Sequence, residues 1–335
     1  MRALSSRVRG IVSWLLLGLG GWALIFQREE APIWVILGLL TAIGPLGKAW
    51  RMASGTALRP LVVWGGIAVL LAAIGQAVAW GEPLESGRPG AGHWSYLSSL
   101  AVLAALISVF NARRPGGGAW ALLMGLLVLV FLLPWLEGSG LAGGVGGLDR
   151  LWLEAPWSWF FALLALAGTT NYLPTRYGPA AAVLLGALAA EFAGLVGLGL
   201  GPEVRGRLWS ASAWGLAVAV QVAATDSQRK TLPATSGLER LWMPFRDHWG
   251  LIWGLRIMER FNRSAQILGW PIRLSWQGVV PAEGVEGPAE PPPPAEATLR
   301  GLLRRFADPA RMEHWARLAG TPGDQMGGIE RRSSL

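Results

Sequence analysis

The chain has 335 residues, of which 52% are hydrophobic and only 15% are charged, with a formal net charge of +8 and a mean hydropathy of +0.40. Soluble domains carry about a quarter charged residues, so this composition excludes an ordinary soluble protein and predicts a membrane protein. The chain contains no cysteine, which excludes disulfide bonds, thiolate metal sites, iron–sulfur clusters and a cysteine nucleophile.

The apolar residues are gathered into blocks of about 17 to 25 residues, the length that an α-helix needs to cross a bilayer. These blocks predict an all-α polytopic membrane protein with a bundle of about eight transmembrane helices. The first block begins like a signal peptide, but no small-x-small cleavage pattern precedes Gln27, so we expect it to be retained. The sixth block, with Thr169, Thr170 and Asn171, is the least apolar. The predicted spans are residues 10–26, 31–47, 61–80, 94–110, 119–136, 157–173, 179–199 and 208–224.

The distribution of charge predicts the orientation of these spans, because Lys and Arg near span ends stay on the cytoplasmic side. With the N-terminus inside, every acidic loop residue falls outside. This favours the cytoplasmic (inner) membrane of a bacterium, a multi-pass topology and both termini in the cytoplasm. Outside, residues 138–147 are Gly-rich, and residues 148–154 are expected to form a short amphipathic turn, with a re-entrant loop as the alternative. The basic residues of the inner loops are Arg2, Arg7, Arg9, Lys48, Arg51, Arg59, Arg113, Arg114 and Arg176.

Tryptophan favours the headgroup region of a bilayer, because its ring is amphipathic. Many of the 20 tryptophans lie at or near predicted span ends, which supports the span boundaries. These are Trp22, Trp34, Trp50, Trp80, Trp94, Trp135, Trp157 and Trp209.

After the transmembrane domain, residues 1–224, the composition becomes charged and proline-containing. Residues 225–280 are predicted to be a cytoplasmic amphipathic helix region, 281–297 a Pro-rich linker that is extended and largely disordered, and 298–335 a basic helical tail. The tail is expected to hold two short helices, residues 298–306 and 309–319, the second opened by Asp308 and Pro309. The C-terminal region is thus predicted to be mostly helical and partly disordered.

In the region 225–280, apolar residues recur at spacings of three and four between residues 241 and 268, which predicts one helix that Gly269 and Pro271 end. Its first half carries Trp242, Phe245 and Trp249 beside arginines. Two interpretations stay open: a helix lying in the membrane interface, or a helix packed on the inner ends of the spans. Residues 272–277 alternate between apolar and polar side chains and predict one short strand.

The sequence contains few residue patterns that indicate catalysis or the binding of a metal or cofactor. The histidines, His93, His248 and His314, lie outside the predicted spans, with His93 in an outer loop, so no pair can ligate a haem within the bilayer. No His–Glu cluster has metal-ligand spacing, and no Gly pattern lies between a strand and a helix as a phosphate loop requires. We therefore predict no metal and no cofactor. Ser and Thr are abundant, but none stands with a base in a recognised catalytic spacing.

Glu191 is the only acidic side chain within a predicted span. A charge at the middle of a bilayer costs about 2.5–3.5 kcal/mol on insertion scales, so such a residue is expected to face protein or water. Small residues, Ala182, Gly186, Ala190 and Gly194, recur at every fourth position beside it and are expected to pack against a neighbouring helix.

Depth within the bilayer, at about 1.5 Å of rise per residue, narrows the partners of Glu191. Three polar side chains fall at a similar level, namely Gln76, Ser99 and Ser212. We expect the carboxyl group to be protonated or hydrogen-bonded to one of them. A purely structural role in helix packing and a role in proton or ion coupling are both compatible with this placement.

These observations favour an integral membrane subunit or scaffold without its own catalytic site, which presents a basic cytoplasmic tail to lipid or to a partner protein. Anionic lipid is nearer to the tail than nucleic acid, which we do not expect as a partner. One alternative is a small transporter or channel that uses Glu191. A second is a membrane enzyme that acts on a lipid-linked substrate, for which His93 and Asp149 are the only polar candidates in the outer loops.

Overall fold

The structure is a computed structural model that describes residues 2–81, 90–110, 118–138, 153–196, 198–226, 236–285, 287 and 290–318. Residues 148–152 of the predicted turn, which include Asp149, and residues 319–335 of the predicted tail lie outside this part. The chain divides into two compact units. The first, called the bundle unit, comprises Met1–Ser54, Leu58–Asn111 and Gly116–Ser227; the second, called the C-terminal unit, comprises Gly55–Ala57, Ala112–Pro115 and Gln228–Leu335.

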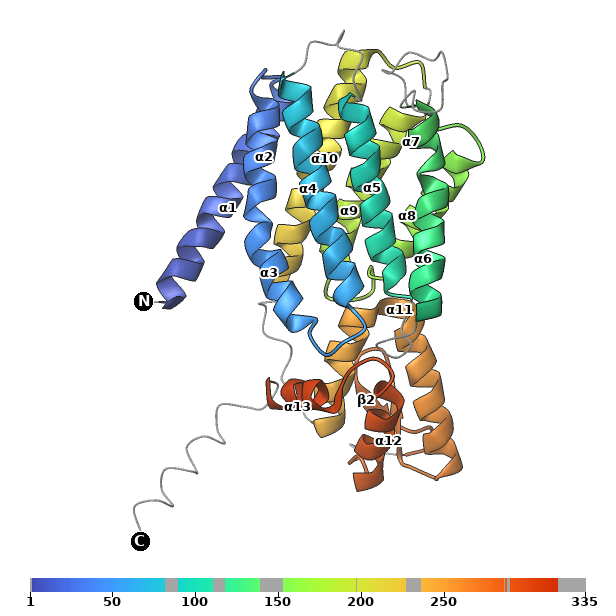
Figure 1. Ribbon diagram of the computed structural model, residues 1–335. Coiled ribbons are helices and arrows are strands. Elements are labelled where there is room, and N and C mark those ends of the chain that lie inside the picture. Colours follow the sequence, from blue (N-terminus) through green and yellow to red (C-terminus); the bar gives the residue numbers. More distant parts are fainter. Residues whose placement is uncertain are drawn as a thin grey trace. The chain divides into compact units, whose positions relative to one another are not determined.

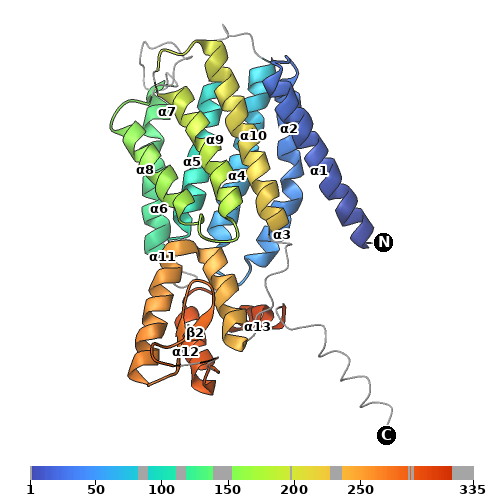
Figure 2. The ribbon, with the colours of Figure 1, turned by 180° about the vertical axis from the view of Figure 1, so that it is seen from behind.

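The bundle unit is built of helices that run side by side (Figures 1 and 2). Among the residues that the structure describes, five helical segments are long and apolar enough to cross a membrane: Ala31–Met52, Arg59–Gly81, Ala91–Ser108, Gly178–Leu195 and Pro202–Asp226. Shorter apolar helices occupy Gly10–Ile25, Gly125–Leu136 and Trp157–Thr170. The prediction of a helical protein suited to a membrane is confirmed, whereas the number of eight crossings stays a prediction. The helix bounds are α1 Arg2–Ile25, α2 Ala31–Thr41, α3 Ile43–Met52, α4 Arg59–Gly81, α5 Ala91–Ser108, α6 Gly118–Phe131, α7 Leu133–Gly138, α8 Trp157–Thr170, α9 Gly178–Leu195 and α10 Pro202–Asp226.

Helix α5 forms the centre of the bundle unit, since it is buried nearly all round and packs against α4, α8, α9 and α10. Its many small residues allow this close approach. At Gly92, for example, a Cβ atom would lie 2.5 Å from the ring of Trp209 on α10. Two of its polar side chains donate to neighbouring helices: Ser98 to the carbonyl of Ala68 at 2.9 Å, and Tyr96 to the carbonyl of Phe131 at 2.6 Å.

Helices α9 and α10 pack along each other, but through only part of the row of small residues that the sequence singles out. Ala182 and Gly186 are exposed, and a Cβ atom at Gly186 would meet nothing within 4 Å. The last member of the row, Gly194, approaches Trp209, and Ala187, which lies outside the row, approaches Gly215. Leu188 and Leu195 of α9 are also buried, and each buries more apolar area than an alanine would.

The second predicted span is divided at Ala42, between α2 and α3. A break of this kind frees backbone groups that need partners where water is absent. Gln221 of α10, which is buried, donates from its side-chain amide to the carbonyl oxygen and the hydroxyl oxygen of Thr41, both at 2.9 Å. This polar side chain therefore stabilises the break.

The C-terminal unit consists of α11 Gly237–Ile267, the strands β1 Ile272–Leu274 and β2 Val279–Pro281, α12 Pro293–Leu303 and α13 Pro309–Leu318. The single strand predicted at residues 272–277 is one half of an antiparallel hairpin, in which Leu274 pairs with Val279. Ser236 caps α11 by accepting a hydrogen bond from the Glu239 amide at 3.3 Å. The helix ends before Gly269, whose φ of +64° suits the expected C-terminal glycine.

Helix α11 is interrupted at Gly250, where φ is +75° and ψ is −165°. Only glycine adopts this backbone conformation readily, so the glycine at position 250 determines where the helix kinks. Helix α12 begins at Pro293, inside the stretch that was predicted to be a disordered linker. Proline suits the first turn of a helix, since its missing N–H has no partner there in any case, and Ala295, Leu299 and Leu303 are fully buried behind it.

The aromatic residues of α11 form the core of the C-terminal unit. Trp242, Phe245 and Trp249 are each 0% exposed, and rings of Phe306 and Trp315 pack against them. These rings therefore contact other residues of their own unit, and the two interpretations of the segment, a helix in the membrane interface or a helix packed on the inner ends of the spans, stay predictions. Sequence alone could not show that α12 and α13 cover them.

Residues 55–57, between α3 and α4, also belong to the C-terminal unit. The amide of Ala57 donates to the carbonyl of Phe306 at 3.0 Å, and the amide of Asp308 donates to the carbonyl of Gly55 at 2.9 Å. The chain between α12 and α13 is thus held to a segment far from it in sequence.

Candidate functional site

Glu191, the residue singled out by the sequence, lies on α9 and is 1% exposed, so it faces other helices rather than lipid. The hydroxyl group of Ser95 on α5 donates a hydrogen bond of 2.6 Å to its Oε2 atom. The Ser212 hydroxyl of α10 also lies close enough to interact with this carboxyl group. Within the described residues, the second oxygen, Oε1, has no hydrogen bond of good geometry.

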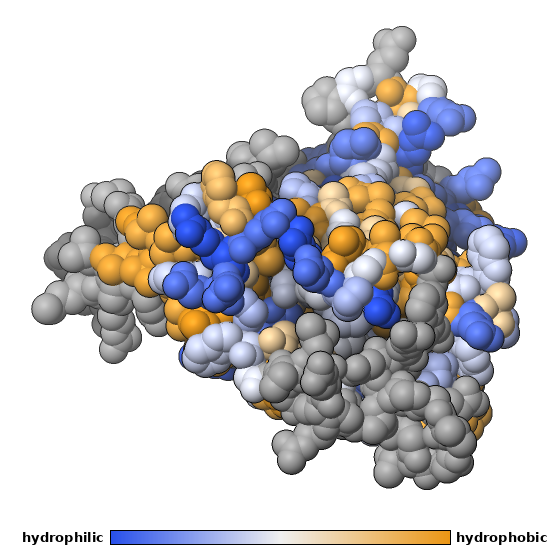
Figure 3. All heavy atoms as spheres, turned by 90° about the horizontal axis from the view of Figure 1, so that it is seen from above, coloured by the Kyte–Doolittle hydropathy of each residue, from blue (hydrophilic) through white to orange (hydrophobic). Residues whose placement is uncertain are grey.

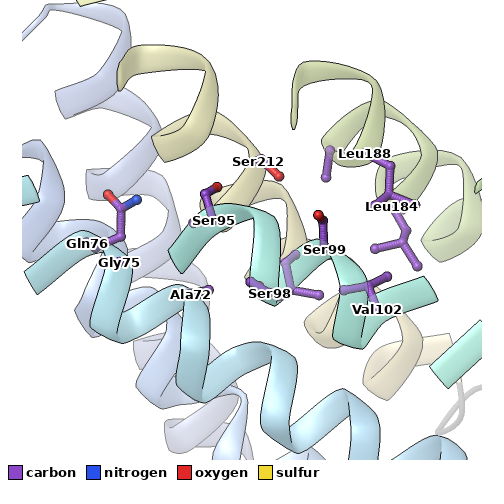
Figure 4. Close-up of a pocket in the computed structure, with 13 residues that line it drawn as sticks. Ala72, Gly75, Gln76, Ser95, Ser98, Ser99, Val102, Leu184, Leu188 and Ser212 are labelled. Carbon is purple, nitrogen blue, oxygen red and sulfur yellow. The ribbon is translucent and has the colours of Figure 1, made fainter. Parts of the chain in front are cut away.

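A small cavity adjoins this hydrogen bond, between α4, α5, α9 and α10. Figure 4 shows Gln76, Ser95, Ser99 and Ser212 around it, with Leu184 and Leu188 on the α9 side. Its volume, counted as the space open to the centre of a water molecule, is about 20 Å³. A cavity needs about 10–15 Å³ by this measure to hold one water molecule, so there is room for one water and for no organic substrate.

The structure brings all three expected polar residues to this cavity, but gives them different partners. Gln76 accepts a hydrogen bond of 2.9 Å from the hydroxyl of Ser210, and Ser99 donates to the carbonyl of Tyr96 at 2.8 Å. The partner of Glu191 that sequence reasoning missed is Ser95. The spacing of the serines could have identified it, because Ser95 and Ser99 are four residues apart and therefore share one face of α5.

The other candidate residues do not join this site. His93, expected in an outer loop, lies in the first turn of α5 and is 2% exposed, because α5 begins three residues earlier than the predicted span. His248 has its Nδ1 atom 2.6 Å from the carbonyl oxygen of Pro244, one turn earlier in α11. His314 lies on α13, where burial and the charges of Arg311 and Arg317 lower its pKa. Within the described residues, no three His, Asp or Glu side chains gather as metal ligands do.

The arrangement can fix how the helices pack, it can hold a proton at Glu191, and it can hold a water molecule in the cavity beside Ser95. A carboxyl group that receives a serine hydroxyl acts as an acceptor, and the adjoining cavity has room for one water molecule. Nucleophilic chemistry would need a base within reach of a hydroxyl and access for a substrate. The cavity has no room for such a substrate.

Replacing Glu191 by leucine is expected to lower the free energy of unfolding of the bundle unit by about 1–3 kcal/mol, because the Ser95 hydroxyl loses its acceptor in a buried place. Glu191→Gln keeps an acceptor oxygen and should lie within about 1 kcal/mol of the wild type. Thermal unfolding in detergent measures both, with Glu203→Gln, at an exposed position, as the control. Equal stability of the leucine and glutamine variants would contradict the importance of this hydrogen bond.

The fold and the site together define a helical protein whose helices are long and apolar enough to cross a membrane, with one buried carboxyl group among serines. Comparisons of the chain with protein-family models, with curated proteins and with solved structures found no match.

Proposed function

We propose that this protein is an integral membrane subunit or scaffold without a catalytic site, which holds its folded C-terminal unit at the membrane for a partner protein. The observation that carries the proposal is the size of the polar cavity lined by Ser95, the hydrogen-bond partner of Glu191. At about 20 Å³ it admits one water molecule and offers no passage for a solute. A buried polar network of this kind fixes how helices pack, which suits a scaffold.

The C-terminal unit supplies a surface for such a partner. Arg304, Arg305 and Arg317 are exposed on and after its last helices, whereas Arg300 is held by Glu296 at 2.7 Å. The aromatic core beneath them keeps this surface in a fixed form, so that little ordering is needed on binding. Charged groups at the rim of an interface speed association and select partners of opposite charge. An acidic protein surface is the partner that this chemistry favours.

The proposed topology has eight spans in the cytoplasmic membrane of a bacterium, with both termini in the cytoplasm. It is supported by the basic residues of the inner loops, such as Lys48, Arg51 and Arg59, and by acidic residues such as Glu29 and Glu30 beyond the opposite end of α2. Figure 3 looks onto that opposite end and shows hydrophilic residues gathered on it, with hydrophobic residues beside them.

Affinity purification from native membranes in mild detergent tests the scaffold. The wild-type chain is expected to retain a partner in fixed stoichiometry, and a variant with Arg304→Ala, Arg305→Ala and Arg317→Ala should retain at least about tenfold less of it. Arg273→Ala, an exposed arginine of the hairpin that pairs with Glu283 at 3.0 Å, is the control and should behave as wild type. Recovery of a solitary monomer from wild-type membranes would count against the proposal.

The second candidate function is proton or ion coupling through Glu191. It is favoured by one specific observation: the carboxyl group is buried and its hydrogen-bond partner Ser95 lines a cavity with room for one water molecule. Proteoliposomes with an imposed pH gradient measure this function. Faster dissipation by wild type than by Glu191→Gln would favour coupling, and equal rates would favour the scaffold.

A further inference from the structure

A second cavity of the bundle unit is a groove on its outer surface, between α2–α3 and α4, which lie side by side (Figure 1). Its volume, counted in the same way, is about 530 Å³, within the range of about 300–1,000 Å³ that is typical of ligand sites. Every residue that lines it is apolar or glycine. Leu39 and Val69 form its buried floor, and Leu40, Ile43 and Leu70 are exposed along its rim.

The groove is open because glycines stand where larger side chains would fill it. Gly47 of α3 and Gly66 of α4 both line it, and a Cβ atom added to either would meet nothing within 4 Å. The break between α2 and α3 at Ala42 lies beside the same groove.

One end of the groove is basic. Trp50 lines this end, and the guanidinium group of Arg59 lies 5.2 Å from the centre of its ring. Lys48 and Arg51 of α3 are exposed beside it, and the sequence contains no Asp or Glu from residue 31 to residue 81. Tryptophan and arginine together at the end of an apolar surface are typical of the level of lipid headgroups.

The length of the groove distinguishes a lipid from a helix as its occupant. It follows α4 from Val62 to Ala73, which is eleven residue steps and a rise of about 16 Å. The hydrocarbon core of a bilayer is about 30 Å thick, so the groove covers about one leaflet, starting from the basic end. An acyl chain fits this length, whereas a transmembrane helix of a second copy would need a groove about twice as long.

We propose that this groove binds one anionic phospholipid, with an acyl chain along α4 and the phosphate group at Lys48, Arg51 and Arg59. The guanidinium group of Arg59, held over Trp50, presents a planar set of donors that suits phosphate oxygens. The apolar walls accept the chain without leaving any polar group unpaired. The site is distinct from the small cavity beside Ser95.

Native mass spectrometry of the full chain, released from detergent with added phosphatidylglycerol or phosphatidylcholine of the same acyl chains, tests the site. One phosphatidylglycerol is expected to be retained in preference to phosphatidylcholine. Arg59→Ala should reduce this preference about fivefold, since one basic residue near an anionic surface contributes about that much. Gly66→Leu fills the groove and should reduce retention of both lipids.

Two matched controls keep the test selective. Arg28 stacks on Trp22 at 5.3 Å, away from the groove, so Arg28→Ala should leave the preference unchanged. Gly186→Leu also adds a side chain at an open glycine, on α9, and should retain lipid as wild type does. Equal retention of the two lipids by wild type, or unchanged retention by Gly66→Leu, would overturn the proposal. A wild-type dimer that Gly66→Leu converts to a monomer would also overturn it, because a second copy of the chain would then occupy the groove.

Discussion

Replacing Trp249 by alanine is expected to lower the free energy of unfolding of the C-terminal unit by about 3–5 kcal/mol, the usual cost of removing a large aromatic side chain from a core. Trp249 is 0% exposed. Its ring stacks on Phe245 with centroids 5.0 Å apart, and it meets Phe306 and Trp315 edge-on at 5.9 and 5.8 Å. These contacts join α11 to α13 and to the chain before it, so the cavity left by alanine cannot be closed by one small movement.

Thiol labelling measures this loss of stability, because the chain contains no cysteine of its own that would react. A single Ala295→Cys substitution on α12, at a position that is 0% exposed, reacts with a thiol reagent only when the C-terminal unit opens. The rate of labelling against denaturant then reports the stability of this unit within the full chain. Ile267→Ala is the control, because Ile267 lies on α11, as Trp249 does, and is 76% exposed. A Trp249→Ala protein that labels no faster than this control would contradict the assigned core.

The same residues mark how far the sequence predicts the fold. The apolar blocks predict the helices of the bundle unit well, because length and hydrophobicity alone decide whether a helix suits a bilayer. The fold of the C-terminal unit is harder to predict from the sequence, since Trp242, Phe245 and Trp249 have the composition of an interfacial helix. Only the tertiary contacts with Phe306 and Trp315 show that these rings form a core. Periodicity indicates that a face is buried, but not what covers it.

The candidate site shows the same limit at a finer scale. Sequence identified Glu191 and the level at which its partners lie, because an acidic residue in an apolar block has few explanations. It did not identify Ser95, since the match in depth selected Ser99, which lies one helical turn away on the same face of α5. The groove beside Gly66 had no signal at all, because a glycine in an apolar helix does not show whether a neighbour or a lipid lies against it.

A second large effect is expected from Arg246→Ala, at about 3–5 kcal/mol of lost stability in the same unit. Arg246 donates to Oδ1 of Asp247 from Nε at 3.0 Å and from Nη2 at 2.7 Å. The Asp247 side chain is 1% exposed and that of Arg246 is 12% exposed, so the pair is largely removed from water. Alanine would leave the carboxylate buried without this counter-ion, which is more costly than losing the pair as a whole.

Arg246 also connects α11 to the turn of the hairpin. Its Nη1 atom donates to the carbonyl of Trp276 at 2.6 Å, and its guanidinium group lies 5.4 Å from the centre of the Trp276 ring. The same ring packs so closely on Gly254 that a Cβ atom there would lie 2.7 Å from it. Arg246→Lys should therefore also destabilise the unit, since an ammonium group cannot donate in a fork to Asp247 and reach the Trp276 carbonyl from the same plane.

The thiol-labelling assay with Ala295→Cys measures these variants as well, and a double variant separates the charge from the packing. If the cost of Arg246→Ala comes from the stranded carboxylate, then Arg246→Met combined with Asp247→Leu should be more stable than Arg246→Ala alone, despite carrying one more substitution. If the double variant is the less stable of the two, the buried carboxylate without its counter-ion is not the main cost of Arg246→Ala. In that case Asp247 makes contacts that a leucine at this position cannot replace.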